Sequence, residues 1–499
     1  MQELSEDTLE TVAAIKKAQT SGILESTGFY SYDLSGLISL IPVVTPFRDH
    51  VARKQSPDGN PFAVWRAIMN VTDSQPSPAM GFDYAANEVQ ISEQDFQAPY
   101  MPTGYAGFVT QDAFDMAKGY ADPYAVMTFN TLNQVLIGDD RLMLGAQQFP
   151  LAAAVAPTLT QHTTGGTIGS ATVYVGVAAR TSSGYYYGYG NSQGASNDTV
   201  FSSGSTNSVS ATTTATRGAT CYDWFQSPTG NPGSWLYYTT TVINAVTMTS
   251  VITSNNALPA TLPDLQQTFW KGSNASAIPT YLSTADNGSA NPSEYDGFLA
   301  SLSGDYNSTG QWVQPGTGTA NPSVWNTLNG AALTLSGGSI AEIENDLFLP
   351  LWNQVKCSPT ALMMNATQAQ EVANLVLGSN SATTFLNTDS AGRISVTAGG
   401  RVGELVNAPA GGVTVPIEVH VSLPPGTIIA RSDRVPFPQA NISSVLECRT
   451  LRDTAQFDYG ISRVANAKGG GPRREFEIRT ISAMVNRAPV AAGVLSCIS

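Results

Sequence analysis

Apolar residues repeat at three- and four-residue steps more clearly in one stretch than anywhere else in this chain. They are Ala125, Phe129, Leu132 and Leu136. This spacing places them on one face of an α-helix. Asp122 is suited to cap the first turn, and Pro123 fits the first helical position. We therefore predict a long helix that begins at Pro123 and ends at Gly138.

The helix prediction also decides how the Gly-Asp-Asp sequence at Gly138 to Asp140 is interpreted. The same three letters occur in a metal-binding motif of polymerases. Here they follow directly on the last apolar repeat, where a glycine commonly ends a helix and acids face solvent. We therefore expect a helix end with solvated Asp139 and Asp140.

Alternation with a period of two marks most of the remaining chain. Residues 65 to 105 fit a β-hairpin with a proline-rich tip, and the window from 151 to 250 shows short alternating runs at the spacing of a β-sandwich. That window has the size of one immunoglobulin-like domain, and Arg217 to Gln226 resembles the central strand of fibronectin type III-like modules. The C-terminal part, above all Arg474 to Asn486, alternates again, so the fold class is α+β.

A second helical region follows the sandwich window. Ser339 with Glu342 three residues later predicts a capping box for the helix that follows. Asn365 is suited to begin another short helix, which Gly378 closes.

Composition narrows the function classes. A chain of 499 residues is too long for one core, and two to four domains are expected. Charged residues make up only 12%, below the roughly 25% of ordinary soluble domains. The net charge of −14 argues against a dedicated nucleic-acid binder, although ten cations face six acids between Arg431 and Arg487. The simplest interpretation of that basic region is a solvated or ion-paired face.

A search for catalytic or metal-binding residues finds no constellation. Four scattered cysteines form no Cys-x-x-Cys pair, and three histidines stand in unrelated contexts. No phosphate-binding loop, zinc motif or nucleophile elbow is present, although spacing alone leaves carboxylate pairs open. The acidic N-terminus and the lack of an apolar run of about eighteen residues argue against a secretory signal and a membrane span. We expect no enzyme activity, no cofactor, no metal and synthesis in the cytoplasm.

The order of these elements resembles the major capsid proteins of tailed bacteriophages, whose fold is shared with the floor of herpesvirus capsids. The order is an extended arm, a long hairpin, a long helix, a capped helix leading into a small α/β unit, and long terminal strands. The resemblance covers everything except the sandwich window. It implies an N-terminal arm (1–57), an extended loop (58–106), a peripheral domain with the spine helix (107–150, 251–356 and 438–499), an inserted immunoglobulin-like sandwich (151–250) and an axial domain (357–437).

This resemblance implies a structural protein of the virion. Hexamers and pentamers would assemble in the bacterial cytoplasm into an icosahedral procapsid that matures around packaged double-stranded DNA. The implied partners are further copies of the chain, a separate scaffolding protein, a portal and a minor cement protein. Some family members form an isopeptide bond from a lysine in the extended loop, but no lysine lies between Lys54 and Lys118 here. Non-covalent contacts are therefore expected to hold the shell.

Two surfaces are candidate binding sites. The first is a tyrosine cluster in the sandwich window, where Tyr, Ser, Gly and Asn occur together as they do in adaptable recognition loops. It is predicted to point outward and to bind cell-surface carbohydrate, and the alternative is that its tyrosines pack as strand residues. The second surface would face DNA through sequence-independent phosphate contacts. The residues are Tyr185, Tyr186, Tyr187 and Tyr189 for the first, and Arg473, Arg474 and Arg479 for the second.

Two other function classes stay open at this point. A secreted polysaccharide-active enzyme with an accessory sandwich would explain the acidity and the abundance of Thr and Ser, but it predicts a signal peptide and a carboxylate cleft. A phage tail or fibre adhesin would share the sandwich, but it predicts repeats. Neither set of features is evident in the sequence.

Overall fold

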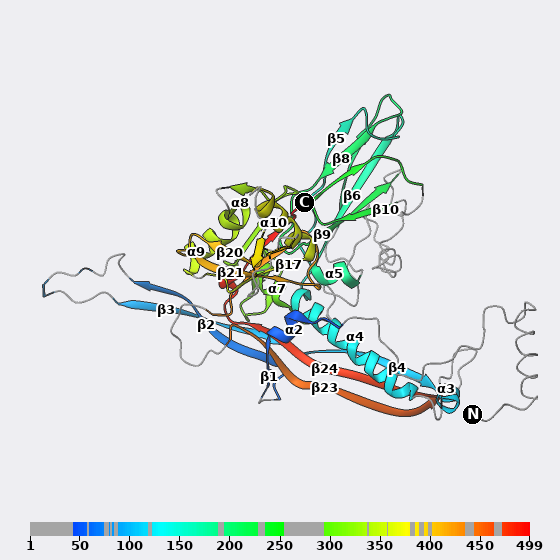
Figure 1. Ribbon diagram of the computed structural model, residues 1–499, viewed down its shortest axis with the longest axis vertical. Helices are drawn as coiled ribbons and strands as arrows, with labels where there is room; N and C mark the ends of the chain where they lie inside the picture. The colour runs from blue at the N-terminus through cyan, green and yellow to red at the C-terminus, as the bar shows by residue number, and fades with distance from the viewer. Residues whose placement is uncertain are drawn as a thin grey trace, which may run out of the picture.

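The computed structural model of the chain is shown in Figure 1. Most of the predicted arm, residues 1–42, lies outside the part of the chain that it describes, and so does Tyr189. The described residues are 43–56, 59–73, 79, 82–83, 88–117, 122–187, 194–227, 235–253, 294–336, 339–356, 358–379, 385–388, 394–397, 402–434, 444–463 and 472–499.

A long, thin sheet and one long helix form the lower layer in Figure 1. The sheet has the order β1-β23-β24-β4, and β23 and β24 are far longer than average strands. Phe476 and Ile478 of β24 alternate toward the helix α4 and pack against its Val135. The elements are β1 (Ala52–Gln55), β4 (Met101–Thr110), α3 (Gln111–Met116), α4 (Pro123–Gly145), β23 (Leu446–Arg463) and β24 (Pro472–Asn486).

The helix α4 begins as predicted, with Asp122 accepting hydrogen bonds from the backbone N–H groups of Tyr124 and Ala125. It does not end at Gly138, because it continues two turns further to Gly145. Gly138 is buried beside the rings of Tyr105 and Tyr187, where an added Cβ would lie 3.4 Å from the Tyr187 hydroxyl oxygen. The glycine therefore makes room for packed tyrosines instead of ending the helix.

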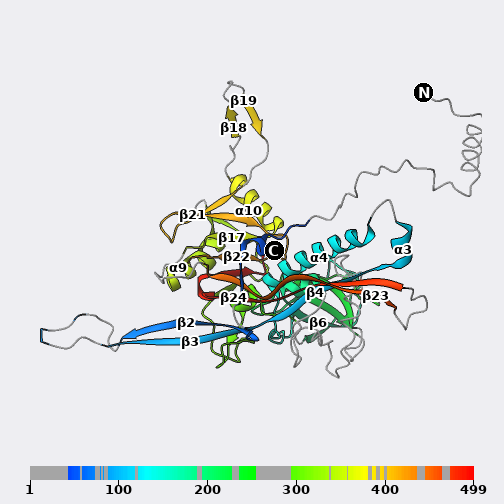
Figure 2. The ribbon, with the colours of Figure 1, turned by 90° about the horizontal axis from the view of Figure 1, so that it is seen from below.

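A two-stranded hairpin leaves this layer and projects sideways. Strands β2 (Phe62–Asp73) and β3 (Val89–Pro99) pair along their whole length, from Phe62 opposite Pro99 to Asp73 opposite Val89. Both views show the outer part of the hairpin reaching beyond the rest of the described chain (Figures 1 and 2). The hairpin predicted over residues 65–105 is therefore present, although its strands are Phe62–Asp73 and Val89–Pro99 and the chain from Met101 pairs with β24 instead.

A six-stranded mixed sheet forms the centre of a second unit. Its order is β14-β25-β22-β17-β21-β20, and α10 and α9 pack with it around Leu347, Leu362 and Val415. Strands β14 and β25 belong to segments that sequence analysis placed in the peripheral domain, yet they lie in the same sheet as the strands of the predicted axial domain. The boundary between the two predicted domains therefore does not separate the sheets as expected. The strands are β14 (Val324–Thr327), β17 (Ala361–Met364), β20 (Glu404–Asn407), β21 (Val413–Val419), β22 (Ile428–Arg431) and β25 (Gly493–Ser496).

Short elements complete this part of the chain. The predicted capping box is wrong, because Ile340 precedes α8 without a side-chain cap, and Glu342 accepts hydrogen bonds from Thr334 instead. The remaining elements are α2 (Pro46–His50), α7 (Phe298–Ser303), β12 (Asp305–Tyr306), β13 (Trp312–Val313), β15 (Leu335–Ser336), β16 (Ser339–Ile340), α8 (Ala341–Ile343), a π-helical segment (Glu344–Phe348), α9 (Leu349–Val355), α10 (Ala366–Ser379), β18 (Phe385–Thr388), β19 (Ile394–Thr397) and a 3-10 turn (Pro489–Ala491).

The window 151–250 contains two sheets that enclose one core and rise above the rest in Figure 1. One sheet has the order β10-β9-β6-β7 and the other β11-β8-β5. The elements are β5 (Thr158–His162), β6 (Thr172–Arg180), α5 (Ser182–Tyr187), β7 (Ala195–Val200), β8 (Ser208–Thr212), β9 (Cys221–Ser227), β10 (Leu236–Thr241) and β11 (Ala245–Met248).

This strand order differs from that of an immunoglobulin domain, whose first, second, fourth and fifth strands share a sheet. Here the pairs β6–β7 and β9–β10 both stay within one sheet, while β5, β8 and β11 form the other. A two-sheet sandwich is therefore present, and the immunoglobulin-like assignment is too specific. The alternating pattern is common to all sandwiches, so it could not distinguish their connectivities.

Candidate assembly surfaces

The root of the β2–β3 hairpin is held by a cluster of aromatic rings. Trp65 of β2 stacks on Phe96 of β3 with a centroid distance of 5.8 Å. Phe96 in turn packs at 5.2 Å from Tyr306 and at 5.7 Å from Trp312. The hairpin therefore leaves the body of the protein from a fixed, buried base.

The outer part of the hairpin carries apolar side chains that nothing in the described chain covers. Val71, Val89 and Ile91 are 57%, 61% and 60% exposed. A two-stranded hairpin is at best marginally stable in water, and exposed apolar residues on one usually mark a contact surface. This part of the hairpin is the strongest candidate for an intermolecular contact.

The last part of the spine helix α4 anchors the described end of the predicted arm. Asp140 accepts hydrogen bonds from the backbone N–H groups of Phe47 and Arg48, at 2.9 and 2.8 Å, in the first turn of α2. Its other oxygen accepts the hydroxyl of Ser422. Burial raises the pKa of Asp140, while these hydrogen bonds oppose the rise. Asp140 thus ties three distant segments together.

The neighbouring Asp139 pairs with Arg48 at 3.0 Å and with Arg53. Both acids are almost completely buried. The expectation of solvated acids is therefore wrong, because the helix continues past them into the core. The signal that sequence analysis missed is a pair of arginines in the last part of the predicted arm, Arg48 and Arg53, which can neutralise Asp139.

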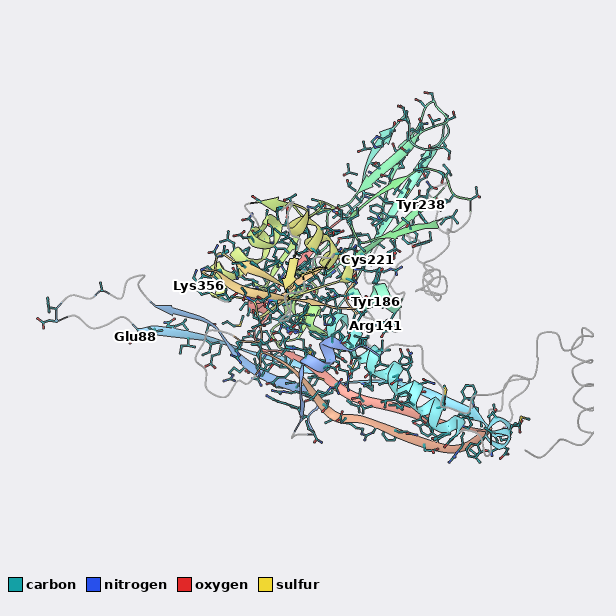
Figure 3. All side chains as sticks on the ribbon, viewed as in Figure 1. Glu88, Arg141, Tyr186, Cys221, Tyr238 and Lys356 are labelled. Carbon is teal, nitrogen blue, oxygen red and sulfur yellow. The ribbon has the colours of Figure 1, made fainter. Side chains whose placement is uncertain are left out.

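The tyrosine cluster lies at the foot of the sandwich. Tyr185, Tyr186 and Tyr187 belong to the short helix α5, which packs against α4. The Tyr186 hydroxyl donates to the Val421 carbonyl at 2.8 Å, and Arg141 of α4 lies over its ring (Figure 3). Burial raises the pKa of Tyr186 and of Tyr187.

These contacts favour the packing alternative over a carbohydrate-binding surface, although the residues form a helix and not the expected strand. The rings fasten the sandwich to the spine helix and to the loop after β21. Tyr189, the fourth member of the predicted cluster, is outside the described residues.

The predicted DNA-facing arginines do not form one free basic surface. Arg473 pairs with Glu475 and lies over Phe108. Arg474 lies over Tyr124, 4.9 Å from its centroid, on the face of the sheet that meets α4. Arg479 shares the opposite face with Arg473, as alternate positions along β24 do.

Within the described ranges, no group of three or more His, Cys, Asp or Glu could hold a metal ion. Burial raises the pKa of Cys221, and it raises that of Cys448 to about 12, so neither is an activated thiolate. Burial also lowers the pKa of His420 to about 4. Among the described helices, none is long and apolar enough to cross a membrane.

Comparison with known proteins gives matches in structure only. No protein-family model and no curated protein matches the chain in sequence. A capsid of an empty GTA particle matches with a TM-score of 0.40 and 8% identity, covering 93% of this chain and 94% of that one. The capsid of Myoviridae phage XM1 gives 0.37 and 7%, covering 95% and 99%.

The solved structure of phage G gp27 major capsid proteins and gp26 decoration proteins also matches. Its TM-score is 0.36 at 7% identity, with all of both chains covered. These three neighbours are named as a GTA particle capsid, a phage capsid and phage major capsid proteins with decoration proteins.

Proposed function

We propose that this chain is a major capsid protein, which assembles as hexamers and pentamers into an icosahedral shell around packaged double-stranded DNA. The observation that carries the proposal is the β2–β3 hairpin, which projects from a fixed root and exposes Val71, Val89 and Ile91. In one isolated copy these side chains remain in water. A neighbouring copy that covers them makes the hairpin part of a larger core.

The rest of the architecture supports this role. The long sheet with its spine helix and the six-stranded sheet share one core that includes Phe47, Met143, Met363 and Met484. The long sheet with α4 and the six-stranded sheet therefore form one body, which we call the plate, and the hairpin projects from it. Since no lysine lies between Lys54 and Lys118, the hairpin supplies no lysine for an isopeptide bond, and we expect it to bind its neighbours through non-covalent contacts.

The proposal extends to the partners and the location that such a shell requires. A separate scaffolding protein would guide assembly in the bacterial cytoplasm, a portal would occupy one vertex, and a minor cement protein would bind the outside of the virion. The sandwich rises on one side of the plate (Figure 1) and would face outward. Arg479 is the best placed of the three arginines for a phosphate contact, because Arg473 and Arg474 already have protein partners.

A matched pair of variants tests the assembly role of the hairpin. Ile91→Ser removes an exposed apolar side chain from β3, and Val200→Ser removes one that is 57% exposed on edge strand β7 of the sandwich. We expect unassembled Ile91→Ser protein to melt like wild type but to form few shells in electron micrographs. Val200→Ser should assemble normally. Equal assembly by both variants would contradict the proposed role of the hairpin.

A further inference from the structure

A cavity of about 300 Å³ opens at the root of the hairpin. It lies where β1, the first residues of β2 and the start of β23 meet. The residues that line it include three cations and a single carboxylate, a net charge of +2. They are Lys54, Gln55, Ser56, Asn60, Phe62, Val64, Tyr100, Glu447, Arg449 and Arg487.

The single carboxylate that lines the cavity, that of Glu447, is already paired with cations. Glu447 is buried and accepts from Lys54 at 2.6 Å and from Arg487 at 3.2 Å. Arg449 lies 3.9 Å away. Burial alone would raise the pKa of Glu447, but the hydrogen bonds from Lys54 and Arg487 hold it below its usual value. One carboxylate neutralises one of three cations, so positive charge remains facing the cavity.

Two polar groups at the cavity also lack partners within the described part of the chain. The Tyr100 side chain is nine-tenths buried, with 9% exposure, and its hydroxyl makes no hydrogen bond there. The Nε of Arg487 is likewise buried without a partner among the described residues. A buried donor without a partner is unfavourable, because it loses its hydrogen bonds to water. Tyr100 and Arg487 both line the cavity, so an anionic oxygen-bearing group bound there lies beside two residues with donors that are unpartnered in the described chain.

We propose that this cavity is a binding site for a carboxylate, supplied by an acidic side chain of a second copy of this chain. A carboxylate would lower the excess charge from +2 to +1 and can accept hydrogen bonds from arginine and tyrosine side chains. The inference rests on the proposed assembly function, because it names the contact that a neighbour makes at the hairpin root.

The position of the cavity argues for a second copy as the source. Val64 lines the cavity and is also one of the exposed apolar residues of the hairpin, so a neighbour that covers the hairpin reaches the cavity mouth. The chain supplies carboxylates in excess, with 38 acids against 24 Lys and Arg. Glu88 comes directly before β3 at the outer part of the hairpin (Figure 3), and it is exposed. It is the first candidate for the inserted side chain.

Two substitutions with opposite effects test the site in unassembled protein. Acetate is the probe, and the measurement is the rise in melting temperature when acetate replaces chloride at equal ionic strength. Arg449→Gln lowers the cavity charge to +1 and should weaken acetate binding about fivefold. Glu447→Gln raises the charge to +3, keeps the side-chain shape and should strengthen binding. If Arg449 and Glu447 had purely structural roles, the two variants would not change the acetate-dependent rise in melting temperature in opposite directions. An equal rise in wild type and in both variants would overturn the proposed site.

The same titration on assembled shells identifies the source of the carboxylate. If a second copy fills the cavity, shells of the wild type show no acetate-dependent rise, and Glu88→Gln shells regain it if Glu88 is the inserted residue. If wild-type shells respond as strongly as unassembled protein, the site takes free anions and the proposed source is wrong. Failure to assemble at all would contradict the capsid function and leave the result on unassembled protein standing.

Discussion

The guanidinium carbon of Arg141 lies 4.6 Å from the centroid of the Tyr186 ring. Arg141 belongs to the spine helix, whereas Tyr186 belongs to the helix at the foot of the sandwich, and the Tyr186 hydroxyl reaches the Val421 carbonyl beyond β21. This aromatic side chain thus links its own helix to two other parts of the chain. The sandwich is therefore fastened to the plate and is not a freely tethered domain.

Removing the Tyr186 hydroxyl should loosen this junction. Tyr186→Phe keeps the ring over which Arg141 lies and loses only the hydrogen bond to Val421, which is worth about 1 kcal/mol. We expect faster amide hydrogen exchange in α5 and a small fall in melting temperature. Tyr185→Phe is the control, because the described chain shows no hydrogen bond from that hydroxyl. Equal effects of both variants would show that the bond to Val421 does not stabilise the junction.

Asp140 should matter far more than an ordinary helix cap. Asp140→Ala leaves the N–H groups of Phe47 and Arg48 and the Ser422 hydroxyl without their acceptor in a buried place. We expect a loss of about 3 kcal/mol and rapid exchange of the Phe47 and Arg48 amides. Asp122→Ala, at the exposed start of the same helix, should cost only about 1 kcal/mol. The account of Asp140 as an anchor fails if the two variants are equally stable.

Asp296 should make the stability depend on pH. Burial raises its pKa from the usual 3.8 to about 7, against the hydrogen bond from the Gln148 N–H. The folded state therefore holds this proton more tightly than the unfolded chain. Its contribution to stability is full below about pH 4 and is lost as the pH rises to about 7, with a slope of at most about 1.4 kcal/mol per pH unit.

Melting curves between pH 4.5 and 7.5 test this sign. Asp296→Asn should show a smaller fall in melting temperature with rising pH than wild type does. Asp198→Asn, an exposed acid on β7, should behave like wild type. A pH profile of Asp296→Asn identical to that of wild type would show that this carboxyl does not titrate in the window.

Gly310 sets how closely the hairpin root approaches the body. Its φ is +75°, and an added Cβ would lie 2.0 Å from the Asp95 carbonyl oxygen of β3. Gly316 has a similar φ of +85°, but nothing lies within 4 Å of its added Cβ. Gly310→Ala should therefore cost about 2 kcal/mol more than Gly316→Ala and speed exchange of the Gln97 amide. Similar losses of stability in the two variants would mean that the positive φ, and not the close approach to Asp95, sets the cost of adding a side chain.

The sequence predicted those helices and strands well whose formation depends on neighbouring residues along the chain, such as a helix cap or an alternation of apolar and polar residues. The start of α4 followed from Asp122 and Pro123, and the hairpin and the sandwich followed from alternation. Gly138 misled, because a glycine that makes room for Tyr105 and Tyr187 looks the same in sequence as one that ends a helix. Which role it has depends on residues that are distant along the chain.

The candidate surfaces depend on long-range contacts even more strongly. The tyrosine cluster has the composition of a binding loop, and only its contacts with Arg141 and Val421 show that it packs. The cavity at the hairpin root joins Lys54 with Glu447, 393 residues away along the chain, through the parallel pairing of β1 with β23, and Glu447 in turn holds Arg487. No local pattern carries that information.

Electron microscopy of the purified full-length protein tests the central claim most directly. The account predicts closed icosahedral shells or capsomer rings, alone or with a scaffolding protein, with the β2–β3 hairpin of each copy lying on a neighbour. A monodisperse monomer under every assembly condition would contradict it.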